Sequence, residues 1–238
     1  MKRFCATCFI VSLVAAALAG PAMAGKINLT GSTTVQPIAE LAGDAFAREN
    51  KGISVNVTGG GSGNGIKAII DGTTDIGNAS RFIKPKEVSY AKEKGTYPVP
   101  FCIAYDCIAA VVHPQNPVSN LTISQLKSIY EGKTTNWKEL GGRDAAIVII
   151  SRDPSSGTYE VWNEKVMDNA PVSPTVKLED ANESVLEEVA RNSAAIGYIG
   201  LGYVNRSVKA VMVDGVQPEP KNALNGRYKI SRSLYMFT

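Results

Sequence analysis

The sequence predicts an α/β fold with mainly parallel sheets. Short apolar segments typical of strands alternate with longer helix-like segments, which is the pattern of strand–helix–strand units. Gly, Ser and Thr cluster where several of these strands give way to helices. The 238 residues suffice for one large domain or for two modest lobes, and either arrangement can bury a hydrophobic core.

The first half of the chain supplies three strand–helix pairs. The expected strands are residues 26–30, 53–58 and 75–78, and the expected helices are residues 35–50, 64–71 and 84–94. Residues 97–113 follow as an apolar run that only Asp106 interrupts. This run is too long for one ordinary strand, so we expect it to pass from one lobe to another.

The second half continues the alternation. Thr122, with Gln125 three residues later, forms a capping-box pattern that predicts the start of a helix. The remaining expected strands are residues 145–151, 195–204, 208–213 and 226–238, and the remaining expected helices are residues 159–169 and 183–192. The chain ends on the apolar residues 234–237, which indicates a chain that continues in nature or a truncated product.

The N-terminal residues read as an export signal. Lys2 and Arg3 precede an apolar stretch at residues 9–19, and A-M-A at residues 22–24 matches an A-x-A cleavage site. The apolar stretch is too short for a permanent membrane span, and no Cys follows it as a lipid attachment point. We expect a signal peptide at residues 1–24, cleavage after Ala24 and a soluble periplasmic protein.

Charge and metal-binding residue types exclude several classes of protein. The chain carries 25 Lys+Arg against 22 Asp+Glu, and the loss of the signal brings the balance close to neutral. A nucleic-acid-binding protein would show a basic surface instead. The only His is His113, so we expect no metal site. Cys102 and Cys107 lie in one apolar run, and their spacing leaves open two separate thiols or a disulfide.

Four loops repeat the order strand, Gly/Ser/Thr loop and helix. They are residues 31–35, 59–65, 77–81 and 151–158. The last, S-R-D-P-S-S-G-T, places Arg152 before a run of hydroxyls and a helix N-terminus, a set of donors that suits a small oxyanion. Each of the first three loops alone is more simply a turn or a helix cap. At the carboxyl ends of parallel strands, the four together predict one shared anion site.

Competing motifs do not match. Gly65 is followed by Ile66 where a Walker A loop requires Lys, and Ile66 also stands where the dinucleotide fingerprint requires Gly. A nucleophile elbow would need Gly in place of Asn64. With His113 as the sole candidate base at the end of an apolar run, we expect no catalytic residues and no enzyme activity.

The four loops resemble those of a known family. The segments TGSTTVQP (residues 30–37), GSGNGIK (61–67), DIGNASR (75–81) and RDPSSGT (152–158), together with the export signal, are similar to the phosphate-binding proteins of bacterial Pst-type ABC transporters. AIGYIG (195–200) also fits that family, and the similarity runs over nearly the whole mature chain.

The resemblance implies a two-lobed periplasmic-binding-protein fold. Each lobe is a mainly parallel sheet flanked by helices, and a hinge joins the lobes. We expect residues 25–108 and 205–238 in the first lobe and residues 109–204 in the second. The implied ligand is inorganic phosphate, held in the cleft, and the implied partner is a membrane ABC permease. No cofactor and no nucleic acid are implied, and we expect a monomer.

Matching motif to motif gives the expected ligand residues. The first lobe offers Ser32, Thr33, Thr34, the Val35 backbone, Ser62, Ser80 and Arg81, and the second offers Arg152, Ser155, Ser156, Gly157 and Thr158. The best-known members carry Asp at the position of Arg81, where it accepts a hydrogen bond from protonated phosphate. The alternatives are therefore binding of sulfate, molybdate or tungstate, and, further away, a secreted phosphatase-like enzyme or a phosphate-sensing module. Asp153 is a substitute acceptor for that proton or a residue that orients Arg152.

Overall fold

The structure, a computed structural model, describes residues 25–238, and the expected signal peptide lies outside these residues. Eight strands form one continuous sheet in the order β2-β1-β3-β11-β4-β8-β6-β7, and β9 pairs with β4. The pairings β1–β2, β1–β3, β6–β7 and β6–β8 are parallel. The expected α/β fold is therefore confirmed, although the pairings of β11 and β4 in the middle of the sheet are antiparallel.

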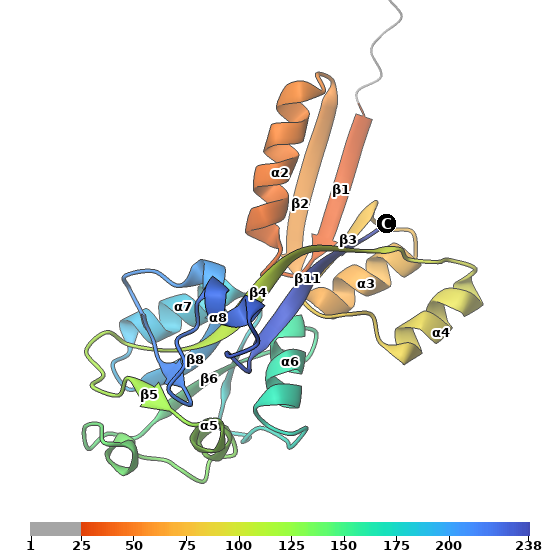
Figure 1. The fold of residues 1–238 in the computed structure, drawn as a ribbon. Coiled ribbons are helices and arrows are strands. Elements are labelled where there is room, and N and C mark those ends of the chain that lie inside the picture. Colours follow the sequence, from red (N-terminus) through yellow and green to blue (C-terminus); the bar gives the residue numbers. More distant parts are fainter. Residues whose placement is uncertain (1–24) are drawn as a thin grey trace, which may run out of the picture.

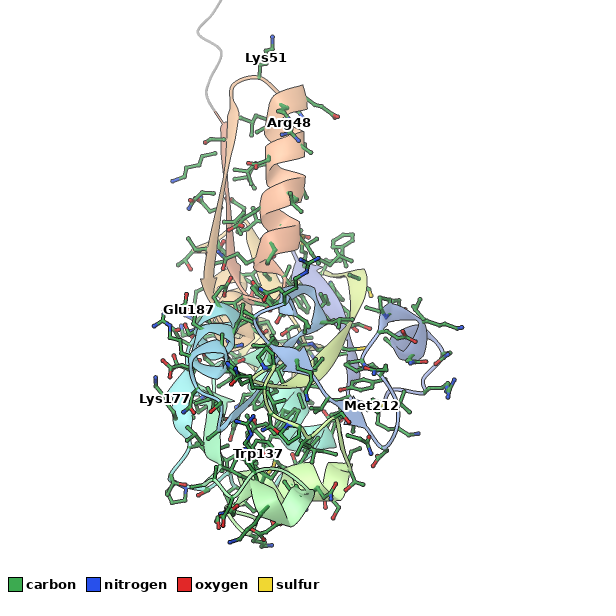
Figure 2. All side chains as sticks on the ribbon, turned by 90° about the vertical axis from the view of Figure 1, so that its left-hand side faces the viewer. Arg48, Lys51, Trp137, Lys177, Glu187 and Met212 are labelled. Atoms are coloured by element: carbon green, nitrogen blue, oxygen red, sulfur yellow. The ribbon has the colours of Figure 1, made fainter. Side chains whose placement is uncertain are left out.

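The first lobe consists of residues 25–106 and 231–238. Its elements are β1 (Gly25–Gly31), α2 (Gln36–Glu49), β2 (Ile53–Gly60), α3 (Ser62–Ile70), β3 (Ile76–Ala79), α4 (Pro85–Lys94), the first part of β4 (Pro100–Val112) and β11 (Ser231–Phe237). Two separate apolar clusters stabilise it, one around Ile66 and Phe237 and one around Leu29 and Leu234. In Figure 1, α2, β1 and β2 project away from the rest of the molecule, and Figure 2 shows Arg48 and Lys51 at their outer end.

The second lobe consists of residues 107–230. Its elements are the rest of β4, β5 (Asn120–Leu121), α5 (Ile123–Tyr130), η2 (Trp137–Leu140), β6 (Val148–Arg152), α6 (Gly157–Lys165), β7 (Lys177–Glu179), α7 (Asn182–Arg191), β8 (Ala195–Gly200), η3 (Leu201–Tyr203), β9 (Lys209–Ala210), β10 (Met212–Val213) and α8 (Pro220–Leu224). Thr122 caps α5 and accepts a hydrogen bond from Gln125 N, as the capping box predicts. Trp137 belongs to the large core cluster of this lobe.

The chain returns to the first lobe later than residue 205, where the sequence led us to expect it. Val211, Tyr228 and Ile230 belong to the core of the second lobe, and the Tyr228 hydroxyl donates to Ile108 O at 3.0 Å. The reason is that β9 pairs with the end of β4, and β10 pairs with β5. Only β11 re-enters the first lobe, between β3 and β4.

The long strand β4 connects the lobes, as its length predicts. Its first half pairs with β11 and its second half pairs with β8. Cys102 is exposed and Cys107 is buried, and both are free thiols, so the disulfide alternative is wrong for this structure. The register with β11 shifts between Leu234 and Tyr235, so Cys102 pairs with Tyr235 and Cys107 pairs with Ser231 despite the odd spacing of the two Cys along β4. Among the helices of residues 25–238, none combines the length and the apolar character needed to cross a membrane.

Candidate functional site

Three loops of the first lobe meet at one edge of its sheet. β1 ends at Gly31, β2 at Gly60 and β3 at Ala79, and the loops that follow carry hydroxyl side chains. The carboxyl ends of parallel strands share one edge, so these loops lie together. Gly31 is required there because its φ is +138° and a Cβ would collide with the Asn78 carbonyl. Ser62 Oγ then accepts from Ser80 N at 2.9 Å, which joins two of the loops.

The second lobe contributes the loop between β6 and α6. Arg152 ends β6, and Ser156 caps α6 by accepting from Thr158 N and Tyr159 N. Gly157 begins α6 directly against the first lobe. A Cβ at Gly157 would fall within 2.7 Å of Ser80 Oγ and still closer to Ser62 Oγ. The helix N-terminus therefore faces the hydroxyls of the opposite lobe.

These residues form a buried polar cluster between the lobes. Thr34 Oγ1 and Thr158 Oγ1, from opposite lobes, lie 3.2 Å apart. Asn182 Nδ2, at the start of α7, donates to Thr33 Oγ1 at 2.9 Å and to Thr34 Oγ1 at 3.1 Å. The cluster consists of Ser32, Thr33, Thr34, Ser62, Ser80, Asp106, Arg152, Ser156, Thr158, Asn182 and Arg232, each at most 8 % exposed. A buried cluster of this many polar side chains is stable only if its hydrogen-bond donors and acceptors are paired.

Arg152 is held by three hydrogen bonds that leave one nitrogen of its guanidinium without a partner in the part of the chain that the structure describes. Its Nε donates to Glu179 O at 3.1 Å, and its Nη2 donates to Asp180 O at 2.7 Å and to Thr33 Oγ1 at 3.3 Å. Its Nη1 is buried and has no hydrogen-bond partner among residues 25–238. Burial lowers the pKa of Arg152, so an anion beside it would stabilise the charged form.

A second buried guanidinium, Arg232, comes from the last strand. Its Nη1 donates to Thr158 Oγ1 at 2.9 Å and to Ser80 Oγ at 3.2 Å, and its Nη2 donates to Thr34 Oγ1 at 3.1 Å. Asp106 on β4 accepts from its Nε at 3.0 Å and from its Nη2 at 2.8 Å. With Arg152, Arg232 and Asp106 the cluster carries about one net positive charge. Such an arrangement of donors and charge suits a small tetrahedral oxyanion.

The comparisons with known proteins agree with this geometry. A protein-family model described as a PBP superfamily domain matches residues 16–238. The phosphate-binding protein PstS of Bacillus subtilis (strain 168) is 34% identical over 215 residues, which cover 90% of this chain and 70% of that protein. The chain belongs to the PstS family.

Solved structures of this family support the same assignment. A phosphate ABC transporter substrate-binding protein of Clostridium perfringens, solved with bound phosphate, is 40% identical, with a TM-score of 0.83 over 90% of this chain and 86% of that one. An ABC-type phosphate transport receptor of Vibrio cholerae is 32% identical, with a TM-score of 0.71 over 89% and 86% of the two chains. The two-lobed fold expected from the family resemblance is confirmed.

Most of the residues matched to the family motifs come together in the cluster, but three do not point into it. Arg81 donates from Nη1 and Nη2 to the carboxylate of Glu87 at 2.9 and 2.7 Å, and its Nε lies 2.5 Å from Glu160 Oε2. Ser155 lies at the rim, where its Oγ donates to Asp153 at 2.5 Å. The Val35 N–H donates to Ser32 O at 3.1 Å. Asp153 accepts from Ser155 N and from Ser155 Oγ and forms no hydrogen bond with Arg152, so it supports the rim of the loop.

Sequence reasoning missed Asp106, Asn182 and Arg232. Asp106 was visible as the one charge inside a long apolar run, which is a signal for a paired buried group. Arg232 lies in an alternating strand and gives no such signal. Asn182 reads as an ordinary residue at the start of a helix. Their roles depend on the strand order, because β11 enters the sheet between β3 and β4 and so brings Arg232 beside Asp106.

Proposed function

We propose that this chain captures inorganic phosphate in the cleft between its lobes and delivers it to the permease of an ABC transporter. The observation that supports this most directly is the buried Arg152 Nη1, which has no acceptor among residues 25–238, while Nη2 of the same guanidinium donates to Thr33 of the hydroxyl cluster. An unpaired charged donor in a buried site is costly, and a phosphate oxygen would supply the acceptor. The names of the related proteins support the same ligand.

The binding energy follows from the number of charged donors. A hydrogen bond to an ionised group contributes about 1.5–3 kcal/mol net, and micromolar affinity corresponds to about −8 kcal/mol. The two unpaired N–H groups of Arg152 Nη1 and the surrounding hydroxyls provide enough donors to reach that value after the cost of closing the lobes, and Arg232 contributes its positive charge. We propose binding without catalysis, because the cluster holds no base beside a nucleophile.

Ligand binding and lobe closure share the same groups. The hydroxyls of Thr34 and Thr158 join the lobes directly, and Tyr203 donates from the second lobe to Thr33 O at 2.5 Å. An anion that pairs with donors of both lobes therefore stabilises the closed form, which is the form that we propose the permease recognises. Periplasmic delivery requires export, so we also propose cleavage of the signal after Ala24, which the mass of the mature protein would test.

Calorimetric titration of the purified mature protein tests the function. We expect one phosphate site per chain with a dissociation constant of micromolar or below, about −8 kcal/mol or more favourable. The reason is that several charge-assisted bonds form in a site shielded from water. Absence of heat and of any thermal stabilisation at millimolar phosphate would contradict the proposal.

Substitution of Glu160 provides a second test. It probes the closure of the two lobes and not a direct contact with phosphate. Glu160 of the second lobe pairs with Arg81 and with Lys84 Nζ of the first lobe, each at 2.5 Å. Glu160→Gln should weaken phosphate binding about three- to tenfold, because the closed form loses a half-buried ion pair that Glu87 cannot replace across the cleft. Calorimetry of this variant measures the change.

Glu164→Gln is the matched control. Glu160 and Glu164 both line a groove of 650 Å³ between the lobes. Glu164 is exposed and forms no ion pair among the described residues. We expect it to bind phosphate like the parent. An equal loss in both variants would mean that general surface charge, and not the bond between the lobes, explains the effect.

A further inference from the structure

The strand that carries Arg152 leaves its neighbour β8 before it reaches the anion cluster. β6 pairs with β8 at residues 148–149 and with β7 at residues 150–152. Just beyond the strand, Asp153 N donates to Glu179 O of β7 at 3.1 Å. Arg152 N, one residue earlier, needs an acceptor on the side of β8, because the backbone N–H groups of a strand alternate between its two sides.

The hydroxyl of Tyr198, on β8, is that acceptor. Ile196 of β8 pairs with Ile149 of β6. Tyr198, two residues further along, therefore lies at the level of Ser151. Its hydroxyl accepts from Arg152 N at 3.2 Å and shares a hydrogen bond with Ser151 Oγ at 2.9 Å. Tyr198, Ser151 and Arg152 are each at most 1 % exposed, so water does not compete for these bonds. One hydroxyl thus fixes the end of the strand from which the Arg152 guanidinium enters the cleft.

The ring of Tyr198 holds the other part of the site that the second lobe contributes. It stacks on Trp162 of α6, with ring centroids 4.3 Å apart and ring planes inclined by 7°. Thr158 lies one turn before Trp162 on the same face of α6. The Thr158 hydroxyl accepts from Arg232 and lies 3.2 Å from Thr34 Oγ1 of the first lobe. The stacked rings therefore limit where the N-terminus of α6 can lie in the cleft.

We infer that Tyr198 is the positioning residue of the anion site, because its hydroxyl holds Arg152 and its ring holds the N-terminus of α6. This inference rests on the proposed function and deepens it. Tyr198 acts through Arg152 and Thr158 and not by contact with the anion. Without its hydroxyl, the end of β6 can relax while the cleft is empty, and binding must then restore the position of Arg152. The cost of that step lowers the affinity for phosphate.

A role confined to packing predicts a different result. Tyr198 belongs to the large core cluster of the second lobe, together with Trp162 and Tyr130. If it served only this core, its substitution would lower the melting temperature and leave the affinity of the folded protein unchanged. Tyr228 provides the comparison, because it is buried in the same cluster and its hydroxyl donates to Ile108 O at 3.0 Å, outside the loop between β6 and α6.

Tyr198→Phe removes the hydroxyl and keeps the ring. We expect the phosphate dissociation constant to rise about five- to twentyfold, because two buried groups lose their hydrogen-bond partner. Tyr228→Phe, the matched control, should change it less than about twofold. Both variants should lower the melting temperature by about 2–4 °C. Calorimetric titration and thermal unfolding of the mature protein measure the two quantities.

Hydrogen exchange locates the effect along the chain. Without phosphate, the backbone N–H groups of residues 150–160 should exchange at least about tenfold faster in Tyr198→Phe than in the parent. Saturating phosphate should restore the protection of the parent, because the bound anion holds Arg152 in place. Tyr228→Phe should show no increase confined to this segment. An increase spread evenly over the core of the second lobe in Tyr198→Phe would indicate a packing role and overturn the inference.

Substitutions of Trp162 test the contribution of the ring. Trp162 Nε1 is buried without a hydrogen-bond partner among residues 25–238, so Trp162→Phe loses no bond and keeps an aromatic ring against Tyr198. We expect its phosphate dissociation constant to stay within about threefold of the parent. Trp162→Leu removes the stack and should raise that constant about fivefold or more.

The outcomes separate the inference from the proposed function. Equal phosphate affinity of Tyr198→Phe and the parent would overturn the inference, and so would an equal loss in Tyr198→Phe and Tyr228→Phe. A Trp162→Leu variant that is folded and binds like the parent would refute the part assigned to the ring. Failure of the parent itself to bind phosphate would instead refute the proposed function.

Discussion

Arg152→Ala is expected to lower phosphate affinity by about 10²–10⁴-fold, the largest effect of any single substitution in the cleft. The change removes the buried Nη1, whose two N–H groups have no partner among residues 25–238 and can each form a charge-assisted bond of about 1.5–3 kcal/mol. The two carbonyls that hold Arg152, Glu179 O and Asp180 O, cannot replace it, because they are acceptors and would repel an anion. Calorimetric titration with phosphate measures the loss.

Two controls separate charge from geometry. Arg152→Lys keeps the charge but loses the planar fork, so we expect an affinity between those of the parent and the Ala variant. Arg206→Ala removes an exposed Arg of the same lobe and should bind phosphate like the parent. An Arg152→Ala variant that is folded and binds phosphate as tightly as the parent would mean that the ligand does not contact this cluster.

The sequence predicted the loops of the site well because each loop follows a local rule. Strands that end in Gly, Ser or Thr before a helix place donors at one edge of a parallel sheet, and this holds for Ser32, Ser62, Ser80 and Ser156. The position of Arg152 at the end of β6 was sufficient to predict that it belongs to the site. Local order along the chain was sufficient for these residues because strand, loop and helix are contiguous.

Arg81 and Arg232 show where local rules stop. Arg81 lies in a predicted loop and Arg232 in the last predicted strand, yet Arg81 pairs with Glu87 and Glu160, and Arg232 occupies the cluster. The outcome depends on which carboxylate each guanidinium meets in space. Residues that come together only through strand order or across the two lobes give no pattern in the sequence, and the late return of the chain at β11 was missed for the same reason.

Gly157→Ala is expected to weaken phosphate binding about a hundredfold while leaving the stability of the fold unchanged or slightly raised. A Cβ at this position would overlap Ser62 Oγ and Ser80 Oγ of the other lobe, so the lobes could not approach to their present distance. Displacement by about 1 Å is enough to break bonds that require donors of both lobes to meet one small anion. Within its own lobe, Ala at the start of α6 is accommodated and favours the helix by about 0.5–1 kcal/mol over Gly.

Thermal unfolding and phosphate titration of the same variant separate these two effects. Gly202→Ala is the matched control, because no atom lies within 4 Å of a Cβ at Gly202 and its backbone conformation is open to other residues. We expect it to keep both the melting temperature and the affinity of the parent. If Gly157→Ala binds phosphate as the parent does, the two lobes need not close to the present contact between α6 and the Ser62–Ser80 pair. The site would then have to bind its anion mainly through one lobe, and the proposed dependence of closure on the shared hydroxyls would be wrong.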